Sequence, residues 1–279
     1  MRIAVGLLCV WFLSASCLAD VNPARILLTF DDGPSTRKRN NPTEVILSVL
    51  QQNSVQSGIK AIFFTQTRLG PDKNGSLTKR LLQQEHEEGH VLAVHNGTLG
   101  ALRSHRSMEG EELDTFLAES QAQLQQFSGR KPVLIRPPMW AFNNSILEAY
   151  QRQGLHMLLT DVSVGDGKSW GFRANPRRRS HLLKEMKAVE QRISAGEIPP
   201  VDGWIPIIVT FHDTNTWTAS HMDEYLQILV DSAGKAGITL DAQPFYACAD
   251  CLEAAALQRS IRETDPESLV PSPWNWLWY

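Results

Sequence analysis

The stretch Thr29-Phe30-Asp31-Asp32-Gly33-Pro34 places two adjacent carboxylates at the end of an apolar run that begins near Arg25. Neighbouring acidic side chains at the end of a buried strand are costly unless a counter-charge compensates them, and a divalent metal ion commonly does so. The Gly33-Pro34 turn that follows predicts that the two carboxylates point in different directions. One carboxylate would then bind a metal ion while the other handles a proton.

Apolar, β-rich runs alternate with helix-period stretches along the rest of the chain, which predicts a parallel sheet surrounded by helices. The predicted strands are 25–30, 58–64, 90–94, 132–135, 155–160, 204–211 and 237–241. The predicted helices are 43–52, 77–88, 110–127, 144–153, 178–194 and 219–236. Four helices end at a glycine that acts as a stop signal, namely Gly89, Gly129, Gly154 and Gly237. The repeated unit of helix, glycine and strand favours a barrel over an open doubly wound sheet.

Length and charge limit the classes of protein to consider. The chain has 279 residues, of which 42% are apolar, and a formal charge of -3. This length suits one large α/β domain, and no break in composition divides it. We expect no nucleic-acid partner, because no basic stripe is available to displace counterions from phosphates. The sequence does not determine the oligomeric state.

The N-terminus has the charged, apolar and small-residue regions of a secretory signal peptide, with Arg2 first and a predicted cleavage site after Ala19. Its apolar run is shorter than the about 20 residues that a membrane-spanning helix needs. We therefore expect residues 1–19 to be removed and residues 20–279 to form a single domain that is secreted or periplasmic, without a transmembrane span. Attachment through a lipidated Cys17 is the less favoured alternative.

Two cysteines remain in the predicted mature chain, Cys248 and Cys251. In an oxidising compartment this closely spaced pair forms either a short-loop disulfide or a pair of thiols. A structural zinc site is not expected here, because it needs four ligands and no histidine lies near.

Further polar side chains follow other predicted strands. In a parallel α/β barrel, the residues at the C-terminal ends of the strands surround the active site. We therefore expect these side chains to meet Asp31 and Asp32 at one end of the barrel. They are His95, Arg136, Asp161, Asp166, His212 and Asp213.

The sequence Thr-Phe-Asp-Asp-Gly-Pro resembles the first motif of the polysaccharide deacetylase family, the NodB-homology domain of family 4 carbohydrate esterases. The resemblance covers about residues 25–241 and implies a distorted (β/α)7 barrel with parallel strands inside and helices outside. It implies that Asp31 is the catalytic base and that Asp32 is the metal-binding carboxylate. It also implies a divalent metal, zinc in preference to others, and a carbohydrate substrate.

The segment that ends in His95 resembles the approach to the second motif, which implies that His95 is the first metal-binding histidine. The family places a second histidine four positions later, where this chain has Leu99. His105 follows a serine, as the family's second ligand does, and is the predicted third ligand after an insertion. Asn96, Thr98 or a water molecule are the alternatives. Catalytic zinc normally has three protein ligands and one open position.

Arg136-Pro137-Pro138 resembles the third motif, in which the arginine orients the base and a backbone N–H after the prolines helps to hold the oxyanion. Met139 and Trp140 stand where the family has tyrosine and glycine. The backbone donor survives this change of side chain. Trp140 narrows the groove, stacks on a sugar ring or packs as part of the wall.

The segment from Asp161 to Gly167 resembles the fourth motif, with Ser163 and Gly167 in place of the usual aspartate and tryptophan. It implies a carboxylate that supports the catalytic histidine. Asp166 is our first choice for this carboxylate and Asp161 the second.

Thr210-Phe211-His212-Asp213 resembles the fifth motif, which implies that His212 is the general acid. Thr210 stands where an aliphatic residue usually lines the pocket for the acetyl methyl group. The polarity of that pocket is therefore an open question at this point.

Together the motifs imply a metal-dependent hydrolase that removes N-acetyl groups from a sugar polymer, whether peptidoglycan, chitin-like or an exopolysaccharide, by cleaving a carbon–nitrogen amide bond. A carbohydrate-binding protein with a degenerate site is one alternative, because Leu99, Ser163 and Gly167 depart from the motifs. An O-acetyl esterase, or a deacylase of a small or lipid-linked sugar, is another, because the same site polarises either carbonyl.

Overall fold

The computed structural model describes residues 22–67, 75–96, 104–108, 110–166 and 178–261. The predicted signal peptide, Cys17, Thr98, Leu99 and Gly167 lie outside these ranges. No helix in the described ranges is long and apolar enough to cross a membrane.

Strands and helices alternate along the described chain, as the sequence predicts. The strands are β1 (Ala24–Gly33), β2 (Ala61–Gln66), β3 (Val91–Asn96), β4 (Leu134–Ile135), β5 (His156–Met157), β6 (Val162–Ser163), β7 (Ile205–His212) and β8 (Leu240–Phe245). The α-helices are α1 (Pro42–Gln51), α2 (Ser76–Glu87), α3 (Gly110–Ser128), α4 (Asn144–Arg152), α5 (Arg178–Ser194), α6 (Thr216–Ser220), α7 (Met222–Ala236) and α8 (Ala249–Arg259). Two 3-10 helices, η1 (His105–Ser107) and η2 (Pro138–Trp140), precede α3 and α4.

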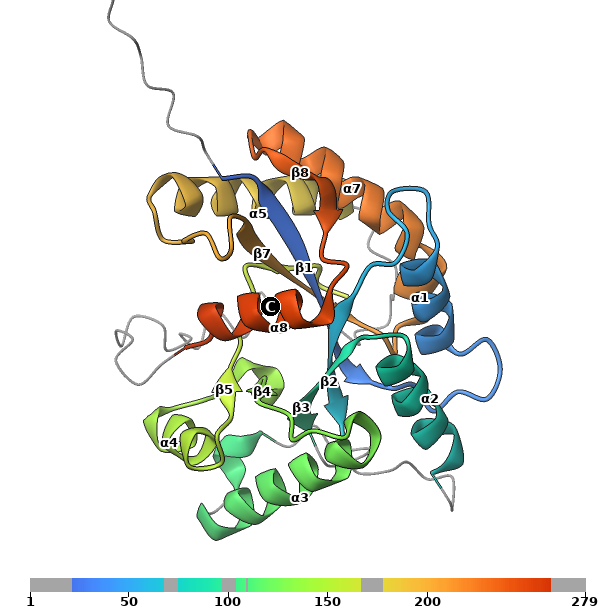
Figure 1. Ribbon diagram of the computed structural model, residues 1–279, viewed down its shortest axis with the longest axis vertical. Helices are drawn as coiled ribbons and strands as arrows, with labels where there is room; N and C mark the ends of the chain where they lie inside the picture. Colours follow the sequence, from blue (N-terminus) through green and yellow to red (C-terminus); the bar gives the residue numbers. More distant parts are fainter. Residues whose placement is uncertain (1–21, 68–74, 97–103, 109, 167–177, 262–279) are drawn as a thin grey trace, which may run out of the picture.

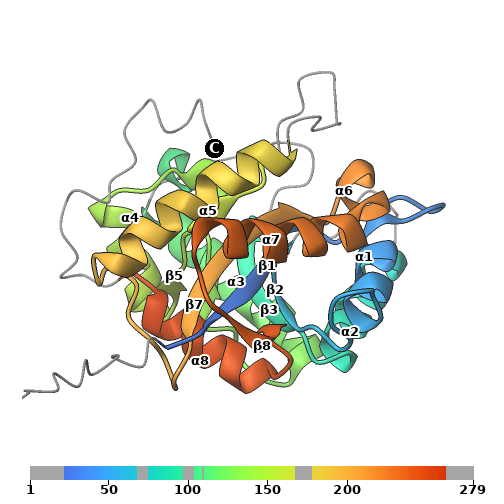
Figure 2. The same ribbon diagram turned by 90° about the horizontal axis from the view of Figure 1, so that it is seen from above.

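The strands form one curled parallel sheet in the order β5-β4-β3-β2-β1-β7-β6, and β8 pairs with the start of β1. Within the described residues no strand pairing joins β5 to β6, so the path does not close. The helices surround the sheet, with α5 and α7 in contact along one side and α1 and α2 beside each other on the next (Figures 1 and 2). This arrangement confirms the predicted distorted (β/α)7 barrel.

Several elements differ from the sequence prediction: the two 3-10 helices were not predicted, and the last strand, predicted at 237–241, is Leu240–Phe245. The predicted helix 219–236 is two helices, α6 and α7, which meet at His221 because that residue has non-helical backbone angles. The two-residue strand β6 and the whole of α8 were not predicted.

The predicted glycine stops are confirmed, since all four have a left-handed backbone, with φ from 67° to 90°. Glycine adopts that region without a steric penalty.

Alternate residues of each strand face two different apolar clusters, because side chains on a strand point to opposite faces. In β1, Ile26 and Leu28 face the core beneath the surrounding helices, whereas Leu27 faces the inside of the curled sheet. Helix α8 lies across the strands of the sheet (Figure 1). The side chain of its Leu252 belongs to this inner cluster.

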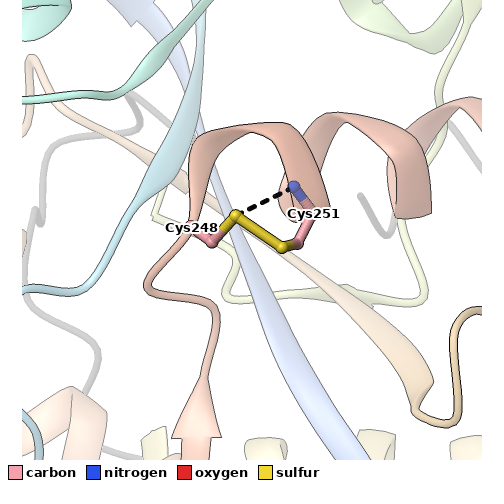
Figure 3. Close-up of a disulfide and its surroundings, with 2 residues drawn as sticks. All are labelled: Cys248 and Cys251. Atoms are coloured by element: carbon pink, nitrogen blue, oxygen red, sulfur yellow. Dashed lines mark hydrogen bonds between the residues drawn. A yellow bond between two sulfur atoms is a disulfide. The ribbon is translucent and has the colours of Figure 1, made fainter.

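A disulfide joins Cys248, the N-cap of α8, to Cys251 in its first turn (Figure 3). The sulfur of Cys248 also accepts a hydrogen bond from the backbone N–H of Cys251. The structure therefore has the short-loop disulfide rather than the pair of thiols.

Candidate active site

The inner face of the strands changes from apolar to polar toward their C-terminal ends. In β1, Asp31 lies on the same face as Leu27, four residues earlier, because side chains repeat every two residues along a strand. Asp31 is in register with His212 on the neighbouring strand β7. The same change, from an apolar residue in the inner cluster to a polar one further along, occurs in β3, which ends with His95 and Asn96. The C-terminal end of the barrel is therefore lined with ionisable groups.

Asp31 is paired with Arg136, and both side chains are almost fully buried. Nη1 of Arg136 donates to Oδ1 of Asp31 at 2.8 Å and to the hydroxyl of Thr29 at 2.7 Å. The guanidinium carbon lies 4.1 Å from the ring centre of Phe64 and 5.1 Å from that of Trp140. The carboxylate is thus oriented by a hydrogen bond from a guanidinium that is itself close to two aromatic rings.

Asp32 points toward two histidines. Its Oδ1 lies 3.4 Å from Nε2 of His95, and its Oδ2 lies 3.9 Å from Nε2 of His212. Asp32 has φ of 69°, a left-handed value that turns its side chain away from that of Asp31. Burial alone would raise the pKa of Asp32, but the two histidines and Gln66 lower it well below its ordinary value. Asp32 is therefore an anion in this site.

His95 presents Nε2 to Asp32 because its other ring nitrogen is occupied. Nδ1 lies 2.8 Å from the backbone carbonyl oxygen of Arg136, where it donates a hydrogen bond as the N–H. Burial lowers the pKa of His95, but the charges of Asp31 and Asp32 raise it above its ordinary value overall.

His105 is fully buried at the start of η1, and it contacts neither Asp32 nor His95 through a hydrogen bond or ion pair in the described structure. Its Nδ1 lies 2.5 Å from the hydroxyl oxygen of Tyr150 on α4. Its Nε2 is buried and has no hydrogen-bond partner. Burial, together with the positive charge of His95, lowers the pKa of His105 to about 3, so this imidazole is neutral.

The donor atoms at this end of the barrel have the chemistry of metal ligands, but the described side chains are not gathered around one point. Oδ1 of Asp32 and Nε2 of His105 are both buried without a hydrogen-bond partner, and one carboxylate with two neutral imidazoles is a ligand set that zinc accepts. Within the described ranges, however, no three His, Cys, Asp or Glu side chains lie close enough together to enclose an ion. The structure brings Asp32 and His95 together and leaves His105 apart from them.

His212 is paired with Asp166, the first-choice carboxylate. Nδ1 of His212 lies 2.8 Å from Oδ1 of Asp166, and the backbone N–H of His212 donates to Oδ2 at 3.0 Å. Thr218 donates to the same Oδ2 at 2.7 Å. Burial lowers the pKa of His212, but Asp166 and the nearby Asp31 and Asp32 raise it to about 10 overall. His212 is therefore protonated at neutral pH in the metal-free protein.

Asp161, the second-choice carboxylate, does not contact His212 and belongs to a different network. Its Oδ1 accepts hydrogen bonds from Arg192 at 2.8 Å and from Arg259 at 2.7 Å. Its Oδ2 accepts from the backbone N–H of Ile208 at 2.9 Å. Asp161 thus joins α5 and α8 to the sheet.

Thr210 does not present a free hydroxyl to the site. Its Oγ1 lies 3.0 Å from that of Thr29, in a fully buried pair. Because the two hydroxyls hydrogen-bond to each other, the hydroxyl of Thr210 is directed toward Thr29 on β1.

Asp213 ends the segment that resembles the fifth motif, but the sequence gives it no role. Its carboxylate accepts from the hydroxyl of Thr43 at 2.7 Å and lies against Gly33, where any Cβ would overlap it. Burial raises the pKa of Asp213 to about 7. Asp213 therefore connects the turn after Asp32 to the strand that carries His212. The position of Asp213 directly after His212 could have indicated that it belongs to the site. Nothing in the sequence indicated that Tyr150 contacts His105.

A model of the polysaccharide deacetylase family matches residues 19–158. The matched segment spans half of the chain and includes Asp31, Asp32, His95, His105 and Arg136. Together with the curled parallel sheet, this match shows that the chain belongs to the polysaccharide deacetylase family.

Among similar proteins, the peptidoglycan-N-acetylglucosamine deacetylase PgdA of Listeria monocytogenes is 30% identical over 219 residues, which cover 78% of this chain and 38% of the relative. This chain thus spans well under half the length of that relative. The chitin deacetylase structure from Colletotrichum lindemuthianum is 19% identical, with a TM-score of 0.56, over 79% of this chain and 85% of the other. A family 4 acetyl xylan esterase from Clostridium thermocellum, solved with a cobalt ion, is 19% identical, with a TM-score of 0.52, over 77% and 86%.

Proposed function

We propose that this protein is a metal-dependent hydrolase that removes N-acetyl groups from a sugar polymer. The observation that carries the proposal is the placement of two proton-transfer groups on neighbouring strands. Asp31 and His212 are in register, each with its own fixed partner, and Asp32 lies between the two histidines of the site. Hydrolysis of an acyl group needs a base, an acid and a site for a cation. Asp31, His212 and Asp32 can fill these three roles.

Asp32, His95 and His105 would hold the metal, and zinc is our first choice because of this ligand set. When bound, the metal supplies a Lewis acid for the acetyl carbonyl and lowers the pKa of a water molecule. The cobalt ion in the xylan esterase structure is consistent with a metal in this family. Asn96 and water remain the alternatives to His105 as the third ligand.

Asp31 takes the proton from the attacking water. Arg136 supports this step in two ways, because its charge stabilises the ionised carboxylate and its fixed hydrogen bond orients it. The second oxygen of Asp31 is then the one that faces the substrate.

The backbone N–H of Met139 would donate to the carbonyl oxygen as it gains negative charge. The next two N–H groups are already used, because those of Trp140 and Ala141 donate to the carbonyls of Pro137 and Pro138. Fixed backbone donors of this kind stabilise the transition state for acyl transfer.

His212 protonates the leaving nitrogen, and this step favours an amide over an ester as the substrate. An amine leaves only after it gains a proton, whereas an alkoxide depends less on a strong acid. The ion pair with Asp166 keeps the proton on His212 until it is needed. The peptidoglycan deacetylase relative also suggests an N-acetylated polymer, and chitin-like polymers and exopolysaccharides remain alternatives.

Acetate release tests this proposal. The purified protein, freed of metal by chelation and then reloaded with zinc, would be assayed on peptidoglycan, chitooligosaccharides and acetylated xylan. We expect zinc-dependent release from an N-acetylated substrate that exceeds release from the xylan ester. Acetate release only from acetylated xylan would show that the substrate is an ester rather than an amide.

A carbohydrate-binding role is the second candidate, because Leu99, Ser163 and Gly167 depart from the motifs of the family. Binding of the same polymers without acetate release, in the presence of zinc, would favour this role.

We also propose that the protein is exported and that its mature form starts at Asp20. Mass spectrometry of protein from cells tests the cleavage, because an intact Met1 terminus would contradict it.

A further inference from the structure

The disulfide between Cys248 and Cys251 lies toward the end of the barrel opposite the candidate active site. The backbone carbonyl of Tyr246, two residues before Cys248, accepts a hydrogen bond from the N–H of Lys60 at 2.7 Å, directly before β2 begins. Strands β1 and β2 are parallel, and Asp31 lies near the C-terminal end of β1. The cysteine pair is therefore separate from the candidate active site.

The two sulfur atoms of the disulfide differ in their access to solvent. Cys248 is exposed at the N-cap of α8, whereas Cys251 is half-buried and packs against the inner apolar cluster (Figure 3). A thiolate from outside attacks the sulfur that it can reach, and the other sulfur leaves. Cys248 is therefore the attacked cysteine and Cys251 the leaving one.

The start of α8 stabilises a negative charge on the sulfur of Cys248. The backbone N–H of Cys251 donates to this sulfur at 3.3 Å, and the N-terminal end of an 11-residue helix favours an anion. Of the acidic side chains in this turn, Asp250 is exposed to solvent and Glu253 is paired with Arg130. A stabilised thiolate favours the reduced pair, which makes the disulfide easier to reduce.

Helix α8 is held in place by contacts that do not involve the disulfide. Leu252, Ala255 and Ala256 are buried in the inner cluster. Arg259, in the last turn, pairs with the buried Asp161 at 2.7 Å. The disulfide joins residues only three positions apart, and a cross-link stabilises a fold less when the loop that it closes is short. The bond can therefore open and close while the helix stays folded.

We propose that Cys248 and Cys251 form a thiol–disulfide exchange site whose partner is a dithiol reductant. One thiolate of the partner attacks the sulfur of Cys248, which breaks the bond to Cys251 and releases Cys251 as a thiolate. The second thiolate of the partner then closes the partner's own disulfide and releases Cys248. Two electrons and the two thiol protons pass from the partner to this protein, so the partner is oxidised and the cysteine pair is reduced. This inference does not rest on the proposed hydrolase function.

Reduction under native conditions tests whether the pair exchanges. The mature protein would be treated with dithiothreitol, quenched with acid and alkylated, and mass spectrometry would count the free thiols. Residues 20–279 contain no other cysteine, so each added alkyl group reports this pair. We expect two free thiols with the circular dichroism of the helices retained. A disulfide that is reduced only after the protein unfolds in urea would overturn the proposal.

Two single-cysteine variants test which sulfur is attacked. Cys251→Ser leaves Cys248, Cys248→Ser leaves Cys251, and each would be incubated with oxidised glutathione. Both variants lack the disulfide, so any loosening of α8 affects them equally. We expect the mixed disulfide with glutathione to form at least about tenfold faster on Cys248, because this sulfur is exposed and lies at the start of the helix. Equal rates, or a faster reaction of Cys251, would overturn the assigned roles.

The reduced wild-type protein tests the second cysteine in the same reaction. We expect glutathione to be displaced from Cys248 by Cys251, so that the disulfide returns and no glutathione stays bound. A mixed disulfide that persists on the wild type would show that Cys251 does not resolve it, and would contradict an exchange site for dithiols.

Discussion

Nδ1 of His212 lies 2.8 Å from Oδ1 of Asp166, and this contact distinguishes two nearby carboxylates that the sequence left as alternatives. Asp166→Asn keeps the shape of the side chain but removes the charge that holds the proton on His212. We expect kcat for deacetylation to fall about 100-fold or more, the scale of a lost acid–base contribution. The melting temperature should fall as well, because the buried Asp166 loses its ion pair with His212. Steady-state kinetics on the folded protein and a thermal scan measure the two effects separately.

Asp161→Asn is the matched control for that substitution. It leaves the largely buried Arg259 without its carboxylate, whereas Arg192 is partly exposed and keeps Glu197. Loss of one member of a buried ion pair costs about 3–5 kcal/mol. We therefore expect lower stability with nearly unchanged kcat for the folded protein. The opposite pattern, in which Asp161→Asn is the catalytically weak variant, would show that contact with His212 is not what matters.

Arg136→Lys should fail although it keeps a positive charge. Arg136 donates to Asp31, Thr29 and two backbone carbonyls from one planar group, and a lysine ammonium lacks this fork. We expect kcat to fall more than about tenfold, because the orientation of the proposed base is lost.

An exposed arginine provides the comparison for this variant. Arg152 pairs with Asp114 on the surface, where such pairs contribute about 0–1 kcal/mol. Arg152→Lys should therefore retain both kcat and stability. If Arg136→Lys behaves in the same way, Arg136 does not orient Asp31.

Glu85 on α2 should destabilise the protein increasingly as the pH rises. Burial raises the pKa of Glu85 well above 4.5, the charges of Asp213 and Glu88 raise it further, and neither carboxyl oxygen has a hydrogen-bond partner. Because the folded state holds the proton more tightly, the favourable contribution is complete below pH 4.5 and is lost as the pH rises toward the folded pKa.

We expect Glu85→Met to stabilise the metal-free protein, and to do so more at pH 8 than at pH 5. The difference in unfolding free energy between variant and wild type should grow with pH, by at most about 1.4 kcal/mol per pH unit and only up to the folded pKa of Glu85. Urea unfolding at the two pH values measures it. Glu87→Met, at an exposed position of the same helix, is the control and should show no such dependence. A gain that is equal at both pH values would mean that Glu85 is not protonated in the folded state.

The barrel was predictable because its signals are local. Apolar strands and glycine stops repeat along the chain, and Gly89 and Gly237 have the left-handed backbone that such stops require. Helix α8 was missed although its sequence is rich in alanine and leucine, and it contributes Leu252 to the inner cluster. The position of α8 depends on packing against the inside of the sheet. The spacing of apolar residues along the sequence does not indicate such long-range packing.

The site was predictable only in part, because motifs name residues but not their partners. The choice between Asp161 and Asp166 needed distances, since both follow the same predicted strand. The contact between Tyr150 and His105 joins residues 45 positions apart through a hydroxyl that no motif marks. The sequence therefore predicted which side chains line the end of the barrel better than it predicted how they pair.

Comparing variants of the two neighbouring carboxylates in one experiment separates proton transfer from metal binding. Asp31→Asn and Asp32→Ala would be purified, incubated with zinc and assayed for bound metal and for acetate released from N-acetylated peptidoglycan and chitooligosaccharides. We expect Asp31→Asn to retain zinc but to release no acetate, because only the proton acceptor is lost. We expect Asp32→Ala to lose both zinc and acetate release. Equal zinc loss in the two variants, or acetate release by Asp31→Asn at the wild-type rate, would contradict the division of roles between Asp31 and Asp32.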